Sequence, residues 1–140
     1  MAVEVIVEYR GDLLCSCVHG PSASSFITDA PVDNQGLGRH FSPTDLVGTA
    51  LASCILTIMG IIARRDGVDI SGTQALVRKE MAASPLRRIG RLELVISFPA
   101  GRNFSPEFLR KLENAAATCP VKQSLHPDVQ LDISFRTLQT

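Results

Sequence analysis

The chain has 140 residues, of which 45% are hydrophobic and 20% charged, and this composition is ordinary for a compact soluble domain with its own core. We therefore expect one domain over residues 1–140. The 14 basic and 14 acidic residues give a formal net charge of zero, which removes the long-range attraction that nucleic acid or an anionic membrane would exert. We expect neither as a partner.

Neither the N-terminus nor the cysteines indicate an exported protein. The first residues, MAVEVIVEYRGD, contain no cationic region followed by a continuous apolar run, so we expect no secretory signal and a cytoplasmic location. The four cysteines are too few and too unevenly spaced for a disulfide scaffold: Cys15, Cys17, Cys54 and Cys119. In a reducing compartment such residues are catalytic, metal-binding or inert buried thiols.

The first forty residues predict three strands and a long loop. Apolar residues at positions 3, 5, 7 and 9 alternate with Glu4 and Glu8, which is the pattern of a strand with one solvated face. A turn at Arg10-Gly11-Asp12 would let residues 13–19 return as the second strand of a hairpin, and a third short strand is expected at 25–28. Residues 29–40, DAPVDNQGLGRH, predict a long loop, and long loops in small domains are often functional.

A long helix is expected to begin after this loop. Ser42-Pro43-Thr44-Asp45 supplies a hydroxyl for the N-cap, a proline for the first helical position and a carboxylate near the positive end of the helix dipole. The helix should run to about Arg65, because Asp66-Gly67 provides a turn residue and a glycine that can adopt the left-handed cap conformation.

The rest of the chain predicts a second hairpin, two helices and a last strand. Strands are expected at 73–81 and 91–98, a helix from Ser105-Pro106, a short helix after Cys119-Pro120 and a strand at 129–135. The order is therefore β-β-β-α-β-β-α-α-β. Strands and helices without regular βαβ alternation favour an α+β fold in which helices pack on antiparallel sheets.

The predicted long helix contains a run of eighteen uncharged residues, LVGTALASCILTIMGIIA, at positions 46–63. This length is borderline for a membrane span, which needs roughly twenty apolar residues. Thr49, Ser53 and Thr57 interrupt the run, and the strands around it have the half-solvated pattern of a soluble sheet, so we favour a buried helix. Small residues such as Gly48 and Gly60 would allow another backbone to approach closely, which indicates a homodimer with this helix near its centre.

Two of the cysteines lie at the positions that a reactive dithiol requires, although each has a simpler explanation. Cys54 falls on an apolar stripe of the long helix, where an inert core thiol is the commoner case. Cys119 precedes Pro120 at an expected helix N-cap, where unpaired N–H groups stabilise a thiolate. A peroxide-reducing dithiol needs one thiolate to become a sulfenic acid and a second thiol to condense with it.

A third group of potential ligands, Cys15, Cys17 and His19, shares one face of a predicted strand. Such a set could contribute to a zinc or other soft-metal site. Same-face residues on an extended strand lie about 6.5 to 7 Å apart, which is wider than one metal accepts without a bend. We therefore expect these side chains to serve in packing and predict no metal site.

Two stretches of the sequence resemble the OsmC/Ohr family, the osmotically induced and organic hydroperoxide resistance proteins: FSPTDLVGTALASC and CPVKQSL. The order of the predicted elements agrees with that family over essentially the whole chain. The resemblance implies an intertwined homodimer with two central helices and active sites at the subunit interface. It also implies a cysteine-based peroxidase without a cofactor, in which Cys54 is peroxidatic and Cys119 resolving. Organic hydroperoxides would be the substrates, and a small dithiol or lipoyl group the reductant.

The chain departs from the hydroperoxidase branch of that family at one position. There, a glutamate follows the proline of the first motif and pairs with an arginine of the N-terminal sheet to hold the thiolate, whereas here that position is Thr44 and the carboxylate follows at Asp45. Asp45 is a candidate to replace the glutamate, and it is equally a capping-box residue. The counterpart of the arginine is Arg10 in the first turn or Arg39 in the long loop. The alternative to a peroxidase is a non-catalytic stress or apolar-ligand-binding protein on the same dimeric scaffold.

Overall fold

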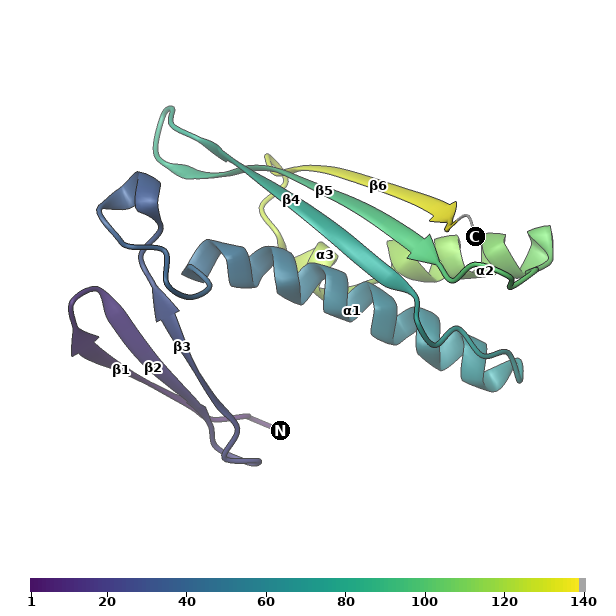
Figure 1. Cartoon of the computed structure of the whole chain (residues 1–140), viewed down its shortest axis with the longest axis horizontal. Helices are drawn as coiled ribbons and strands as arrows, with labels where there is room; N and C mark the ends of the chain where they lie inside the picture. Colours follow the sequence, from purple (N-terminus) through teal and green to yellow (C-terminus); the bar gives the residue numbers. More distant parts are fainter. Residues whose placement is uncertain (139–140) are drawn as a thin grey trace. The chain divides into compact units, whose positions relative to one another are not determined.

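The structure is a computed structural model, and it describes residues 1–138. The chain forms two compact units, Met1–Val47 and Gly48–Thr140, and the long helix α1 (Pro43–Arg65) runs from the first into the second. Figure 1 shows the elements of each unit. The element order is the predicted one, with one addition, a single 3₁₀ turn (η1, Val32–Asn34) inside the long loop.

The first unit contains a three-stranded antiparallel sheet in the order β1-β2-β3 (Figure 1). Its strands are β1 (Val5–Gly11), β2 (Leu14–His19) and β3 (Ser25–Asp29). The first turn begins two residues later than predicted. Gly11 pairs with Leu14, and the turn is made by Asp12 and Leu13, both in the left-handed region with φ of 54° and 62°. Arg10 therefore lies in β1 and not in the turn.

Both faces of β1 are exposed in the single chain. Val7 is 61% exposed on one face, and Ile6, its neighbour on the other face, is 67% exposed. The sequence pattern predicts one solvated face and one covered face, but within residues 1–138 the apolar side chains of β1 stay exposed. The first unit therefore carries an apolar surface, formed by Val5, Val7, Tyr9 and Phe26, that the described chain does not bury.

Both ends of α1 are closed by the contacts that the sequence predicts. At the N-terminus the backbone N–H of Asp45 donates to Ser42 Oγ (3.1 Å), and the N–H of Ser42 donates to the Asp45 carboxylate (2.8 Å). This reciprocal pair is a capping box. At the C-terminus Gly67 has a φ of 69°, and the N–H of Val68 donates to the carbonyl of Ala63 at 2.9 Å, as in a Schellman motif.

The second unit contains a three-stranded sheet in the order β4-β5-β6, in which β6, the last strand in the sequence, pairs with β5. The strands are β4 (Gln74–Ala82), β5 (Arg88–Phe98) and β6 (Gln130–Thr137), and the helices are α2 (Pro106–Ala117) and α3 (Pro120–Ser124). We predicted antiparallel sheets, but β6 pairs parallel with β5. The physical reason is the connection: α2 and α3 form a crossover that returns the chain to the end of the sheet where β5 began.

Helices α1 and α2 cover one face of this sheet, and the core lies between them (Figure 1). Alternate residues of β5 supply the sheet side of the core, all with 2% exposure or less: Leu92, Leu94, Ile96 and Phe98. The helices contribute the facing side chains: Leu51, Ile55 and Met59 from α1, and Phe108 and Leu112 from α2. By length and composition alone α1 could cross a membrane, but in the structure its buried stripe belongs to this core.

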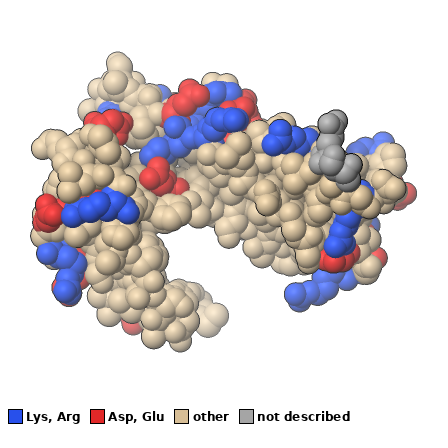
Figure 2. Space-filling view, in the orientation of Figure 1, with Lys and Arg blue, Asp and Glu red and all other residues tan. Residues whose placement is uncertain are grey.

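The other face of the sheet is polar. Arg91 lies between two carboxylates, with its guanidinium 2.8 Å from Glu80 and 2.6 Å from Asp132. Figure 2 shows basic and acidic side chains intermixed over β4 and β5, whereas the visible flank of α1 is uncharged between its ends. This flank is uncharged and carries mainly small and hydroxyl side chains; its exposed residues are Thr49, Ala50, Ser53, Thr57 and Ile61.

Candidate active site

The second unit brings two of the four thiols together. Cys54 lies on α1 at the edge of the buried stripe and is partly exposed, whereas Cys119 is the N-cap residue of α3 and is 0% exposed. Their side chains interact, and both pack in the core cluster between α1, α2 and the sheet. No cysteine among the described residues is in a disulfide, so the structure holds the reduced form of the pair.

Cys119 is positioned by the start of α3. Its Sγ accepts the backbone N–H of Lys122 at 3.5 Å, which fixes the sulfur at the end of the short helix. Burial raises the pKa of the Cys119 thiol, and its interaction with the Cys54 side chain raises it further, while the N–H groups of Lys122 and Val121 act in the opposite direction. Cys119 is therefore held protonated at neutral pH.

Arg39, one of the two candidate cations, is bound by carboxylates of the first unit. Its Nε donates to Asp29 Oδ2 at 2.7 Å, and its Nη1 donates to Asp12 Oδ2 at 3.0 Å. The backbone N–H of Arg39 also donates to Asp29, at 3.0 Å. These contacts lower the pKa of Asp29 to about 2, the side-chain hydrogen bond from Arg39 being the largest cause, and they raise the pKa of Arg39. Arg39 thus ties the long loop to β3 and to the first turn.

Because the carboxylate of Asp29 is buried and ionised, the stability of the folded protein should vary with pH in the acid range. Because the pKa of Asp29 falls from an ordinary 3.8 to about 2 on folding, the stabilisation is present above pH 3.8 and is lost as the pH falls towards 2. We expect Asp29→Asn to lower the melting temperature at neutral pH and this difference to shrink towards pH 2, as measured by circular dichroism melts across that range. Glu8→Gln, at an exposed carboxylate paired with Arg10, is the control and should change little. A difference that stays constant down to pH 2 would contradict the ionic role of Asp29.

The other two candidates for supporting the thiolate have local partners. Asp45 closes the capping box of α1 through Ser42, which is the second of the two roles that the sequence left open. Arg10 projects from β1 and makes an exposed ion pair with Glu8 at 2.9 Å. A role of either residue at Cys54 stays a prediction.

The strand face with Cys15, Cys17 and His19 holds no clustered ligands. Within residues 1–138 no three histidine, cysteine or carboxylate side chains come together as a metal site would require. His19 Nδ1 instead lies 2.6 Å from Ser22 Oγ in the turn after β2, and Cys17 is buried in the sheet between Val7 and Phe26. These contacts are those of a turn and a packed strand.

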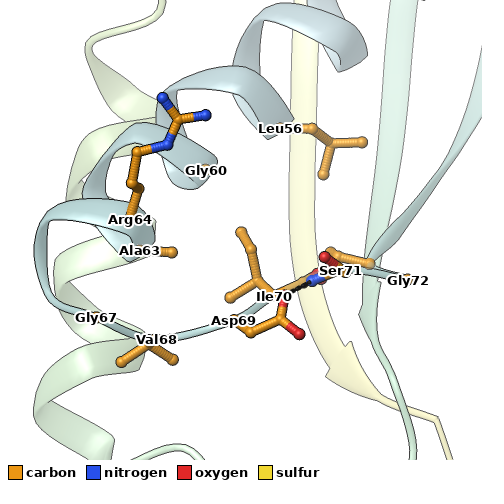
Figure 3. Close-up of a pocket in the computed structure, with 11 residues that line it drawn as sticks. Leu56, Gly60, Ala63, Arg64, Gly67, Val68, Asp69, Ile70, Ser71 and Gly72 are labelled. Atoms are coloured by element: carbon orange, nitrogen blue, oxygen red, sulfur yellow. Dashed lines mark hydrogen bonds between the residues drawn. The ribbon is translucent and has the colours of Figure 1, made fainter.

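A cavity of about 530 Å³ opens between the C-terminal half of α1 and the segment that leads into β4 (Figure 3). Leu56, Ala63, Val68 and Ile70 give it apolar walls, with Arg64 at its margin. Neither Cys54 nor Cys119 lines this cavity, so we do not assign it as the site of a reaction at these thiols.

One residue with a clear role was missed by the sequence reasoning. The sequence predicts Asp29 as the first residue of a loop, yet it ends β3, is 1% exposed and binds Arg39. The available signal was an acidic residue directly after a short strand and ten positions before an arginine. That signal is weak, because it specifies no pairing until the loop is folded.

Comparisons with known proteins agree with this architecture. The family model for OsmC-like protein matches residues 36–134. The chain is 46% identical to a protein of Psychrobacter arcticus 273-4 that is assigned to the osmotic stress induced and detoxification response proteins; its crystal structure matches over 96% of each chain with a TM-score of 0.89. A sequence search of curated proteins gave no match.

More distant structures share the fold. An OsmC-like protein from Mycoplasma pneumoniae is 12% identical and covers 99% of this chain and 98% of its own, with a TM-score of 0.79. The organic hydroperoxide resistance protein OhrB of Bacillus subtilis is 16% identical, with a TM-score of 0.69 over 96% of this chain and 98% of its own. The family model and the Psychrobacter protein together show that the chain belongs to the OsmC-like protein family.

Proposed function

We propose that the protein is a thiol-dependent peroxidase that reduces organic hydroperoxides through Cys54 and Cys119. The observation that carries this proposal is the contact between a partly exposed thiol and a fully buried one, contributed by segments 65 residues apart in the sequence. Similarity in fold to organic hydroperoxide resistance proteins from Bacillus subtilis and Elizabethkingia anophelis supports the substrate class.

The proposed reaction uses only these two sulfurs and the substrate. The Cys54 thiolate attacks the terminal peroxide oxygen, the O–O bond breaks, and the alkoxide takes a proton and leaves as an alcohol. Cys54 is then a sulfenic acid. The Cys119 thiol attacks its sulfur, water leaves, and a Cys54–Cys119 disulfide forms, which a dithiol of the lipoyl type reduces with two electrons.

We also propose which arginine supports the Cys54 thiolate. Arg39 directs hydrogen bonds to both Asp29 and Asp12, and withdrawing it would leave the carboxylate of Asp29 buried without its cation. The ion pair that Arg10 makes within the described residues is with Glu8, both side chains are exposed, and exposed pairs are weak. We therefore assign the supporting role to Arg10.

The active form is proposed to be a homodimer. Two surfaces support it, namely the uncovered apolar face of the first sheet and the uncharged flank of α1, whose small side chains allow another backbone to approach closely. Large exposed apolar patches of this kind mark interaction surfaces. Cytoplasmic location and independence from metal or cofactor complete the proposal.

A substitution on the flank of α1 tests the dimer. Ile61 is 60% exposed there, so Ile61→Glu would bury a charge in the interface, and we expect the dissociation constant to rise at least about a hundredfold. Sedimentation velocity over a range of concentrations measures this change. Leu86→Glu, at a 76% exposed side chain between β4 and β5, is the control and should remain dimeric. Identical sedimentation of both variants and the natural protein would exclude α1 from the interface.

The chemistry is tested by counting free thiols, with mass mapping, before and after one equivalent of cumene hydroperoxide is added to the reduced protein. The expected result is rapid loss of two thiols, mapped to a Cys54–Cys119 disulfide. Absence of a fast loss would contradict the peroxidase and favour the non-catalytic, ligand-binding alternative.

A further inference from the structure

The proposed function leaves open which sulfur of the disulfide the reductant attacks, and the unequal burial of the two cysteines bears on this. We infer that the incoming thiol attacks Cys54 Sγ, so that the mixed disulfide forms on Cys54 and Cys119 leaves. This inference rests on the proposed function, since it concerns the second half of the same cycle.

Access to the two sulfurs differs. Cys119, the N-cap residue of α3, is 0% exposed within the core cluster, whereas Cys54 on α1 is only partly buried against that cluster. Thiol–disulfide exchange requires the attacking sulfur to reach the disulfide sulfur directly. In the single chain, a thiol from solvent can approach Cys54 without opening the core, whereas Cys119 has no exposed surface to approach.

The surroundings of Cys119 also suit a leaving group that stays in place. The backbone N–H of Lys122 points at Cys119 Sγ from 3.5 Å, and this donor remains when the sulfur becomes a thiolate. The short helix α3 keeps the freed sulfur beside Cys54, ready for the next turnover.

One effect acts against this direction of attack. Burial raises the pKa of Cys119, and a thiol with a high pKa leaves more slowly. Access outweighs this effect, because exchange rates depend only fractionally on pKa, whereas a sulfur without exposed surface is attacked only after local opening of the structure.

The step balances as two exchanges. A thiolate of the dithiol forms a bond to Cys54 Sγ, the Cys54–Cys119 bond breaks, and Cys119 leaves as a thiolate that takes one proton. The second thiol of the reductant then attacks its own sulfur in the mixed disulfide. Cys54 is released as a thiolate, and the reductant becomes a cyclic disulfide, having supplied two electrons.

The experiment prepares the disulfide with diamide, so that it needs no peroxide chemistry. The oxidised full-length protein is mixed with excess 2-mercaptoethanol, quenched in acid after short times, alkylated with N-ethylmaleimide in denaturant and mapped by mass. We expect mercaptoethanol on Cys54 and the maleimide on Cys119, in a ratio of at least roughly ten to one. A ratio near one, or mercaptoethanol mainly on Cys119, would overturn the inference.

Single-thiol variants give an independent readout. In a background in which Cys15 and Cys17 are replaced by serine, Cys54 of the folded Cys119→Ser protein should react with 5,5′-dithiobis(2-nitrobenzoate) about a hundredfold faster than Cys119 does in the folded Cys54→Ser protein, and the two rates should converge in denaturant. Equal rates in the folded proteins would overturn the inference.

The two failures can be told apart. Mercaptoethanol on Cys119 in a protein that still consumes hydroperoxide refutes the direction of attack alone. Mercaptoethanol on Cys54 in a protein that does not react with hydroperoxide refutes the peroxidase alone. If diamide forms no Cys54–Cys119 disulfide, both are refuted.

Discussion

Cys54→Ser is expected to lower the turnover of cumene hydroperoxide by on the order of a thousandfold or more, to the background rate of the other thiols. The reason is chemical: a serine hydroxyl is not ionised at neutral pH and is a poor nucleophile, whereas the change in volume is small. Turnover is measured with dihydrolipoamide as reductant. Cys15→Ser is the matched control, because Cys15 is also a partly exposed thiol but lies on β2, in the first unit, and is expected to retain turnover.

Cys119→Ser should stop repeated turnover of the hydroperoxide but not the first oxidation of Cys54. Cys54 would still be oxidised once, but without the second thiol no intramolecular disulfide can form. We expect a single turnover followed by a sulfenic acid on Cys54 that dimedone traps and mass spectrometry locates.

The Cys54→Ser variant decides the assignment of the peroxidatic thiol. Turnover by Cys54→Ser at the rate of the natural protein would contradict that assignment and favour a non-catalytic protein on this scaffold.

The course of the chain could be predicted closely where local chemistry determines it. The capping box of Ser42 and Asp45 and the left-handed Gly67 are short-range features, so the limits of α1 followed from the sequence. The direction of β6 could not be predicted in the same way. Whether it pairs parallel or antiparallel with β5 depends on how α2 and α3 carry the chain across the core, which is a tertiary property.

In the candidate site, too, the local features could be predicted from the sequence and the tertiary contacts could not. The sequence indicates Cys54 and Cys119 as separate thiols, each on a helix, and their contact requires the folded core between α1 and α3. The pairing of Arg39 with Asp29 was not predicted, because it depends on the path of the long loop. Pattern alone also could not show that the apolar face of β1 stays uncovered in the single chain, since an alternating strand is compatible with burial by its own chain or by another.

The largest loss of stability is expected for Phe98→Ala. Phe98 is 2% exposed at the end of β5, and its ring packs against two others, with centroids 5.4 Å from that of Phe104 and 6.4 Å from that of Phe135. Removal of a buried phenyl ring forfeits its transfer free energy and leaves a cavity, which typically lowers the free energy of unfolding by about 3 to 5 kcal/mol. Urea unfolding followed by circular dichroism measures this change, at one protein concentration because dimerisation would contribute to stability.

Phe41→Ala is the matched control for this prediction. The same ring is removed, but Phe41 is 56% exposed in the loop before α1, so a change within about 0.5 kcal/mol is expected. A loss below about 1 kcal/mol for Phe98→Ala would mean that the aromatic cluster is not packed as described.

The same two substitutions also test the burial of Cys119. Cys119 belongs to the same core cluster as Phe98, so a core loosened by Phe98→Ala should expose it. In a background in which Cys15, Cys17 and Cys54 are replaced by serine, the reaction of Cys119 with 5,5′-dithiobis(2-nitrobenzoate) should therefore accelerate with Phe98→Ala and remain slow with Phe41→Ala.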